Sequence, residues 1–146
     1  MFGGVAPFPI IIAKKKDVEK IYSVELNPDA HHYAEENVLI NRVGNKVVPV
    51  LGDVRKFCQD LDEKFERITM HLPEKAWEFL DTAFYCSKKG TIVHLYGIDN
   101  EDEKNLEKRT EKMAKESDVK IKIIEKRKVL PYSPGTYKYC LDILVI

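Results

Sequence analysis

The segment KIYSVELNPDAHHYAEENVLIN, residues 20–41, decides the fold because it places a strand, an acidic residue and a helix in immediate succession. Residues 20–26 are rich in side chains that favour strands, and the run ends on Glu25 and Leu26. Asn27 then offers a capping side chain, Pro28 suits a first helical position, and acidic residues follow. A strand leading directly into a helix predicts a β–α unit of a parallel sheet.

The same alternation continues on both sides of this segment. A helix is predicted from Pro7 to Lys16, and further strands and helices are predicted, in chain order, over residues 45–53, 66–73, 74–86, 90–97, 101–116, 120–130 and 136–146. YSPG (132–135) joins the last two strands and is too short for a crossover helix, so they should pair antiparallel. The sequence therefore predicts an α/β fold, a single domain over residues 1–146 with a mostly parallel sheet and an antiparallel last strand.

Composition excludes several classes of protein. Hydrophobic residues make up 44% of the 146 and charged residues 33%, as in globular proteins. The 24 basic residues balance the 24 acidic ones, so no overall basic field announces a nucleic-acid partner. No apolar run approaches the roughly 20 residues that span a bilayer. PFPIIIA followed by KKK reverses the charge order of a secretory signal, so we expect a cytoplasmic protein without membrane attachment.

A metal site is not expected either. The three cysteines contain no CxxC pair. His31 and His32 are adjacent, so on a helix their side chains point about 100° apart, which is poor for chelation.

The predicted carboxyl ends of the strands carry the candidate chemistry, because ligands of open parallel sheets bind beyond those ends. Gly3 and Gly4 allow a backbone to approach a ligand closely. Glu25 is placed to accept hydrogen bonds from a ribose diol, and Asp53 could accept one from an adenine amino group. Two further predicted strand ends are His71-Leu72-Pro73 and Tyr96-Gly97. Together they indicate a nucleotide-like cofactor.

Six segments, in this order, resemble the catalytic domain of the Trm5-type (Met-10+ like) tRNA (guanine-37, N1)-methyltransferases. They are MFGGVAPFPI (1–10), IYSVELNPDAHHYAEENVLIN (21–41), VVPVLGDVR (47–55), MHLPEKAWEFLDTA (70–83), GTIVHLY (90–96) and PYSPGTYKYCLDI (131–143). The resemblance covers essentially the whole chain. It implies a Rossmann-like class I methyltransferase fold, S-adenosylmethionine as cofactor, and methylation of N1 of guanosine 37 in a tRNA anticodon loop. We expect a monomer that uses no metal.

The resemblance also assigns the cofactor residues. It implies that residues 2–8 line the methionine and ribose side, that Glu25 binds the ribose hydroxyls, and that Leu26 packs on the adenine. The implied cofactor contacts are Phe2, Gly3, Gly4, Val5, Ala6, Pro7, Phe8, Glu25, Leu26, Asn27, Asp53, Val54, His71, Leu72 and Pro73. Glu25 stands where the family has an aspartate, and it keeps the charge and the two acceptor oxygens.

The transferred methyl group and the target base are expected beside His71 and Pro73, which the resemblance implies as catalytic-loop residues. His71 stands where the family has an asparagine, so a titratable ring replaces an amide. Implied substrate contacts are Arg55, Tyr132, Ser133 and Pro134, and the basic runs Lys14–Lys16 and Lys126–Lys128 are candidate tRNA contacts. The family's general base and catalytic arginine lie upstream of Met1.

The family carries a central strand directly before the turn at residues 1–8, together with separate tRNA-recognition domains. We therefore expect this chain to lack its first strand and to be marginally stable alone. Two other functions stay open. One is aminocarboxypropyl transfer to tRNA in the wybutosine pathway, by a related enzyme class that differs at the His71-Leu72-Pro73 loop. The other is an inactive cofactor-binding fragment.

Overall fold

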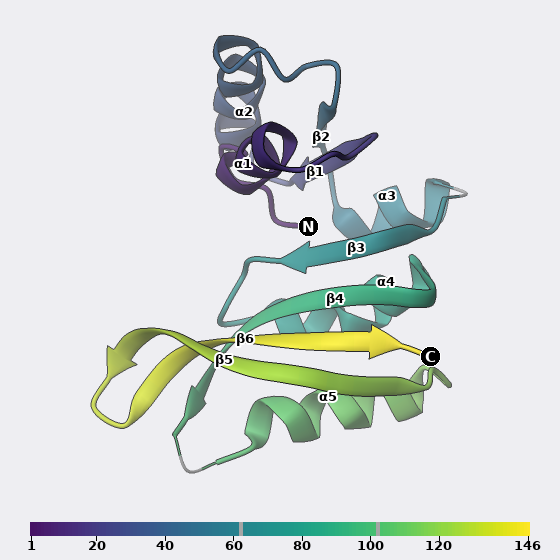
Figure 1. Cartoon of the computed structure of the whole chain (residues 1–146), viewed down its shortest axis with the longest axis vertical. Coiled ribbons are helices and arrows are strands. Elements are labelled where there is room, and N and C mark those ends of the chain that lie inside the picture. The colour runs from purple at the N-terminus through teal and green to yellow at the C-terminus, as the bar shows by residue number, and fades with distance from the viewer. Residues whose placement is uncertain (62, 102) are drawn as a thin grey trace. The chain divides into compact units, whose positions relative to one another are not determined.

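The computed structural model describes residues 1–61, 63–101 and 103–146, which divide into two compact units (Figure 1). The first unit is Met1–Asp60 and the second is Leu61–Ile146. Among the described residues, no helix is long and apolar enough to cross a membrane. The single-domain organisation stays a prediction.

The first unit is a β–α arrangement around a small parallel sheet. Its elements are α1 (Pro7–Lys15), β1 (Ile21–Glu25), α2 (Pro28–Ile40), β2 (Val47–Leu51) and α3 (Val54–Asp60). β1 and β2 pair in parallel from Ile21 opposite Val47 to Glu25 opposite Leu51. Helix α2 begins as predicted, because the Asn27 side chain accepts hydrogen bonds from the backbone N–H groups of Asp29 (2.9 Å) and Ala30 (3.4 Å).

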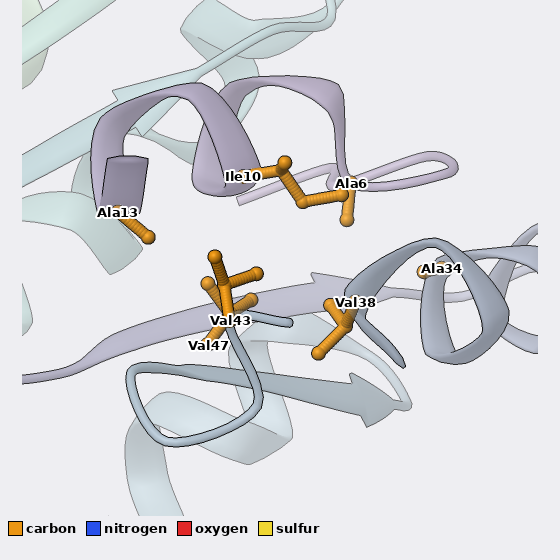
Figure 2. Close-up of a cluster of buried hydrophobic side chains, with 7 residues drawn as sticks. All are labelled: Ala6, Ile10, Ala13, Ala34, Val38, Val43 and Val47. Atoms are coloured by element: carbon orange, nitrogen blue, oxygen red, sulfur yellow. The ribbon is translucent and has the colours of Figure 1, made fainter. Parts of the chain in front are cut away.

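A hydrophobic cluster holds α1, α2 and the β2 strand together (Figure 2). Its buried members are Ala6, Ile10, Ala13, Ala34, Val38, Val43 and Val47. Small alanines on both helices let the backbones approach the valines closely. The cluster therefore fixes the position of the turn that precedes α1.

The second unit is a four-stranded sheet in the order β3-β4-β6-β5. Its elements are β3 (Phe65–Met70), the 3₁₀-helix η1 (Ala76–Phe79), α4 (Leu80–Tyr85), β4 (Ser87–Asn100), α5 (Asn105–Glu116), β5 (Ile121–Ser133) and β6 (Thr136–Val145). β3 pairs in parallel with β4, whereas β6 lies antiparallel to both β4 and β5. The predicted antiparallel last strand is confirmed, and Gly135 (φ 72°) makes the tight turn before it.

One face of this sheet is covered by η1, α4 and α5 (Figure 1). Alternate β4 residues from Thr91 to Asp99 are buried on that face. The missing side chain of Gly97 makes room for Leu106 of α5, whose Cδ1 lies 2.6 Å from where a Cβ would stand. The intervening residues, His94 and Tyr96 among them, lie on the opposite face and are half-buried.

Two local predictions need correction, and one helix was missed. β4 continues to Asn100, so Tyr96 and Gly97 lie within a strand and not at its end, because β6 pairs with β4 over that whole length. The helix predicted over 74–86 is a 3₁₀ turn followed by a short α-helix. Helix α3 was not predicted; Asp53 initiates it by accepting a hydrogen bond from Arg55 N–H (2.7 Å).

Candidate functional site

The glycine turn before α1 adopts a compact, partly left-handed conformation. Phe2, Gly4 and Ala6 have φ angles of 59°, 53° and 62°. The Gly3 N–H donates to the Val24 carbonyl (2.8 Å), and the Ala6 N–H donates back to the Gly3 carbonyl (2.9 Å). Left-handed non-glycine residues cost about 1 kcal/mol or more each, so the buried Ala6 and the strand contact must hold this turn in place.

Glu25 joins this turn to the start of α2. Its Oε2 accepts the Gly4 N–H at 2.8 Å, and its Oε1 accepts the Asn27 N–H at 2.9 Å. A carboxylate offers roughly four acceptor positions, so each oxygen keeps one for another donor. The half-buried carboxylate at the end of β1 is thus preorganised to bind two hydroxyl groups.

The close approach of this turn to β1 depends on the absence of a side chain at Gly3. A Cβ there would lie 2.2 Å from the Oγ of Ser23, which is only 2% exposed. We expect Gly3→Ala to lower the free energy of unfolding by about 2 kcal/mol, because overpacking displaces the Ser23 hydroxyl or the turn. Urea denaturation followed by circular dichroism measures this loss.

The double variant Gly3→Ala/Ser23→Ala tests the cause. With the hydroxyl gone, the nearest remaining Ser23 atoms stand at 3.4 Å, so most of the lost stability should return. Ser23→Ala alone is the control and should change stability by under about 1 kcal/mol. A double variant as unstable as Gly3→Ala would rule out the clash as the cause.

The other site residues predicted in the first unit, the substrate residue Arg55 included, differ in their exposure. Leu26 is 68% exposed and Phe8 42%, and the Leu26 side chain offers apolar surface to a ligand. In contrast, Ala6 and Val54 are buried, and their side chains belong to the packing of the unit. Asp53 and Arg55 are exposed, and one oxygen of Asp53 is used to initiate α3. Phe2 and Val5 lie in the glycine turn, and Pro7 begins α1. Phe2 is half-buried, whereas Val5 and Pro7 are exposed.

In the second unit, His71-Leu72-Pro73 directly follows β3. The Leu72 carbonyl accepts the N–H groups of Lys75 (2.9 Å) and Ala76 (2.6 Å), which turns the chain into η1. The His71 imidazole packs against the Tyr96 ring with 4.2 Å between the ring centroids and 33° between the planes. Burial disfavours the imidazolium and lowers the pKa of His71 to about 4, so the ring is neutral at physiological pH.

The predicted substrate residues of the β5–β6 turn lie close to this loop. The Tyr132 hydroxyl donates to Glu74 at 3.5 Å, and Glu74 follows Pro73 directly. Tyr132 is 52% exposed, and Ser133 and Pro134 are exposed as well. This hydrogen bond places Tyr132 beside the residue that follows the His71-Leu72-Pro73 loop, and Ser133 and Pro134 come next along the chain.

A polar network on the face of the same sheet that is opposite η1, α4 and α5 was missed by sequence reasoning. Arg67 lies 3.2 Å from Nε2 of His94; because a guanidinium only donates, Nδ1 carries the proton and donates to Asp142 (2.7 Å). Burial would raise the pKa of Asp142, but hydrogen bonds with His94 and Cys140 and the charge of Arg127 hold it below its ordinary value. Period-2 alternation would have put these residues on one face, but only the strand register makes them neighbours.

This network also contains the one set of metal-type ligands found among the described residues. Atoms of His94, Cys140 and Asp142 lie within 4.8 Å of one another. Arg127 donates to both Cys140 (3.5 Å) and Asp142 (3.2 Å), so a guanidinium already supplies the positive charge there.

In the first unit, sequence reasoning missed Asn37. Its side-chain amide donates to the Val5 carbonyl (3.0 Å) and links α2 to the glycine turn.

Known proteins are similar to this chain in both sequence and fold. The tRNA (guanine(37)-N(1))-methyltransferase Trm5b of Pyrococcus abyssi is 39% identical over 99% of the chain, which spans 42% of that relative's length. The structure of M. jannaschii TYW2 in complex with AdoMet is 30% identical with a TM-score of 0.87, covering 100% of this chain and 67% of that one. The structure of aTrm5 with tRNALeu is 31% identical with a TM-score of 0.82, covering 100% and 40%.

The family model of the TRM5/TYW2 methyltransferase domain matches residues 1–122. The match includes the glycine turn, Glu25 and the His71 loop, and it covers five of the six segments on which the resemblance rested; the sixth, residues 131–143, lies beyond it. The same family contains structures with the Rossmann-like fold that the sequence predicted. This chain belongs to the TRM5/TYW2 methyltransferase domain family.

Proposed function

We propose that this chain is the cofactor-binding part, together with the loop that faces the target base, of an S-adenosylmethionine-dependent enzyme that methylates N1 of guanosine 37 in tRNA. The observation that carries the proposal is the Glu25 carboxylate, held by the Gly4 and Asn27 N–H groups with one acceptor position left on each oxygen. Two neighbouring hydroxyls of a ribose match these positions. The exposed Leu26 next to it offers an apolar surface to a purine ring.

S-adenosylmethionine, when bound, supplies a methyl group on a sulfonium leaving group. The tasks of the protein are to hold N1 of the guanine in line with that carbon and to stabilise charge that develops on O6 as the N1 proton passes to a general base, a role that the resemblance assigns to no residue of this chain. His71 suits the second task because a neutral imidazole can donate one hydrogen bond. Its pKa of about 4 makes it a weak base at neutral pH, so we assign it no role in removing the proton.

tRNA is the proposed partner, in keeping with the tRNA complex of the aTrm5 relative. Leu72 and Pro73, retained after His71, favour methyl transfer over the aminocarboxypropyl transfer of the TYW2 class. A cytoplasmic location, a monomeric state and a reaction without a metal ion remain predictions.

Incubation of the chain with labelled S-adenosylmethionine and a tRNA transcript tests the proposal. Nuclease digestion and mass spectrometry should find 1-methylguanosine at position 37, and a transcript with adenosine 37 should remain unmodified. An aminocarboxypropyl adduct would reassign the reaction to the alternative class. If the chain binds the cofactor but modifies no transcript, the proposed activity is wrong for this chain and the inactive-fragment alternative stands.

A further inference from the structure

The contact between His71 and Tyr96 is built into the parallel pairing of β3 and β4. Met70 and Leu95 are register partners at the end of β3, so the next residues along each strand are His71 and Tyr96. His71 leaves the sheet there, while Tyr96 continues in β4. Their rings are tilted by 33° with 4.2 Å between the centroids, slightly closer than the roughly 4.5 Å at which aromatic pairs usually begin, so the two rings are in direct contact.

Tyr96 is itself anchored on its other side. Its register partner on β6 is Cys140, a buried free cysteine with which its hydroxyl shares a hydrogen bond. Cys140 in turn contacts Asp142 (3.4 Å) and Arg127 (3.5 Å). Burial is the main cause, and the nearby charge of Cys140 the second, that raises the pKa of Tyr96 to about 12. The hydroxyl therefore keeps its proton. Tyr96 is therefore held between the His71 imidazole on one side and the Cys140 thiol of β6 on the other.

We propose that Tyr96 is a positioning residue, whose ring holds the His71 imidazole in one plane so that a ring nitrogen meets the Watson–Crick edge of the target purine in RNA. The proposal rests on the proposed function, since it gives His71 a partner in the substrate. Loops position polar groups less accurately than strands do, and stacking on a strand residue transfers the rigidity of the sheet to the loop. Ordering before the substrate arrives reduces the cost of reaching the reactive geometry.

Nuclear magnetic resonance of the imidazole groups tests the stack independently of activity. His71→Asn identifies the His71 signal by its disappearance. In the wild type, the Cε1 proton of His71 should lie upfield of those of the exposed His32 and the α2 residue His31, and it should not titrate above pH 5. Tyr96→Phe keeps the ring and should preserve both properties. Tyr96→Leu should remove the upfield shift and move the pKa of His71 upward, because water reaches the imidazole.

Kinetics of methyl transfer supply the functional readout. Tyr96→Leu should lower kcat by about tenfold, the size expected from losing one aromatic contact in the transition state, with KM for S-adenosylmethionine unchanged. Tyr96→Phe should stay within about threefold of the wild type. The matched control is Tyr137→Leu, which removes a half-buried tyrosine from β6 whose ring faces Lys128 and not His71.

The outcomes separate the two proposals. A wild-type His71 that titrates above pH 5 and shows no upfield shift overturns the ring contact, whether or not Tyr96→Leu folds. Equal losses of kcat in Tyr96→Leu and Tyr137→Leu would overturn the positioning role. Wild-type protein with the expected His71 spectrum but no methyl transfer to tRNA would refute the proposed function and leave the ring contact standing.

Discussion

Replacing Glu25 by alanine is expected to weaken the binding of S-adenosylmethionine by about a hundredfold, as measured by isothermal titration calorimetry. The variant loses two charge-assisted acceptor positions for the ribose, each worth about 1.5 kcal/mol or more. It also leaves the Gly4 and Asn27 N–H groups without their acceptor, so the glycine turn is no longer held against β1. Glu25→Gln should lose less, about tenfold, because one of its two terminal atoms still accepts hydrogen bonds.

Two controls make this result interpretable. Glu35→Ala removes an exposed glutamate of α2 that forms an ion pair with His31 at 3.6 Å, and it should bind the cofactor like the wild type. Glu25→Gln nearly preserves shape, so it remains informative if Glu25→Ala unfolds. Undiminished affinity in both Glu25 variants would move the ribose site away from β1. A folded wild type without measurable affinity would contradict cofactor binding by this chain alone.

The first unit was the more predictable part because its signals are local. The strand that ends on Glu25 and the helix that Asn27 caps are encoded within a few residues of one another, and the structure confirms both. The hydrogen bond from Gly4 to Glu25 joins residues 21 apart and could only be anticipated through the family resemblance. The short helix α3 escaped notice because Val54–Asp60 is too brief for a helical period to emerge.

The second unit was harder to predict because its contacts depend on strand register. Tyr96 was expected at a strand end, but antiparallel pairing with β6 extends β4 to Asn100 and makes Tyr96 a neighbour of Cys140. No pattern in the sequence gives the register of strands separated by some 40 residues. The residue types alone also do not show which lysine of the run 126–128 faces solvent and which one forms ion pairs inside the protein.

Lys126 shows this most clearly, since its position in a basic run made it a candidate tRNA contact. Its ammonium group instead donates to Asp99 (2.9 Å) and Glu107 (2.8 Å) and lies 4.5 Å from the centroid of the Tyr139 ring. Burial alone would lower the pKa of Lys126, but the two carboxylates outweigh it and hold that pKa above its ordinary value. The stability that this pairing contributes is therefore present below the unfolded-state pKa of lysine, and it is lost as the pH rises through the folded-state value.

We expect Lys126→Met to lower the free energy of unfolding by about 3 kcal/mol in urea denaturation at neutral pH, because it leaves the Asp99 carboxylate buried without its cation. The Asp99 side chain is 1% exposed, so water cannot replace the ammonium group. Asp99→Asn/Lys126→Met should recover part of the loss by removing the uncompensated charge. Lys128→Met is the matched control two residues along β5; its lysine pairs with Glu101 at the surface, so the change should be below about 1 kcal/mol. A normal stability of Lys126→Met combined with weakened tRNA binding would instead make Lys126 a substrate contact, and the internal ion pair would not be its role.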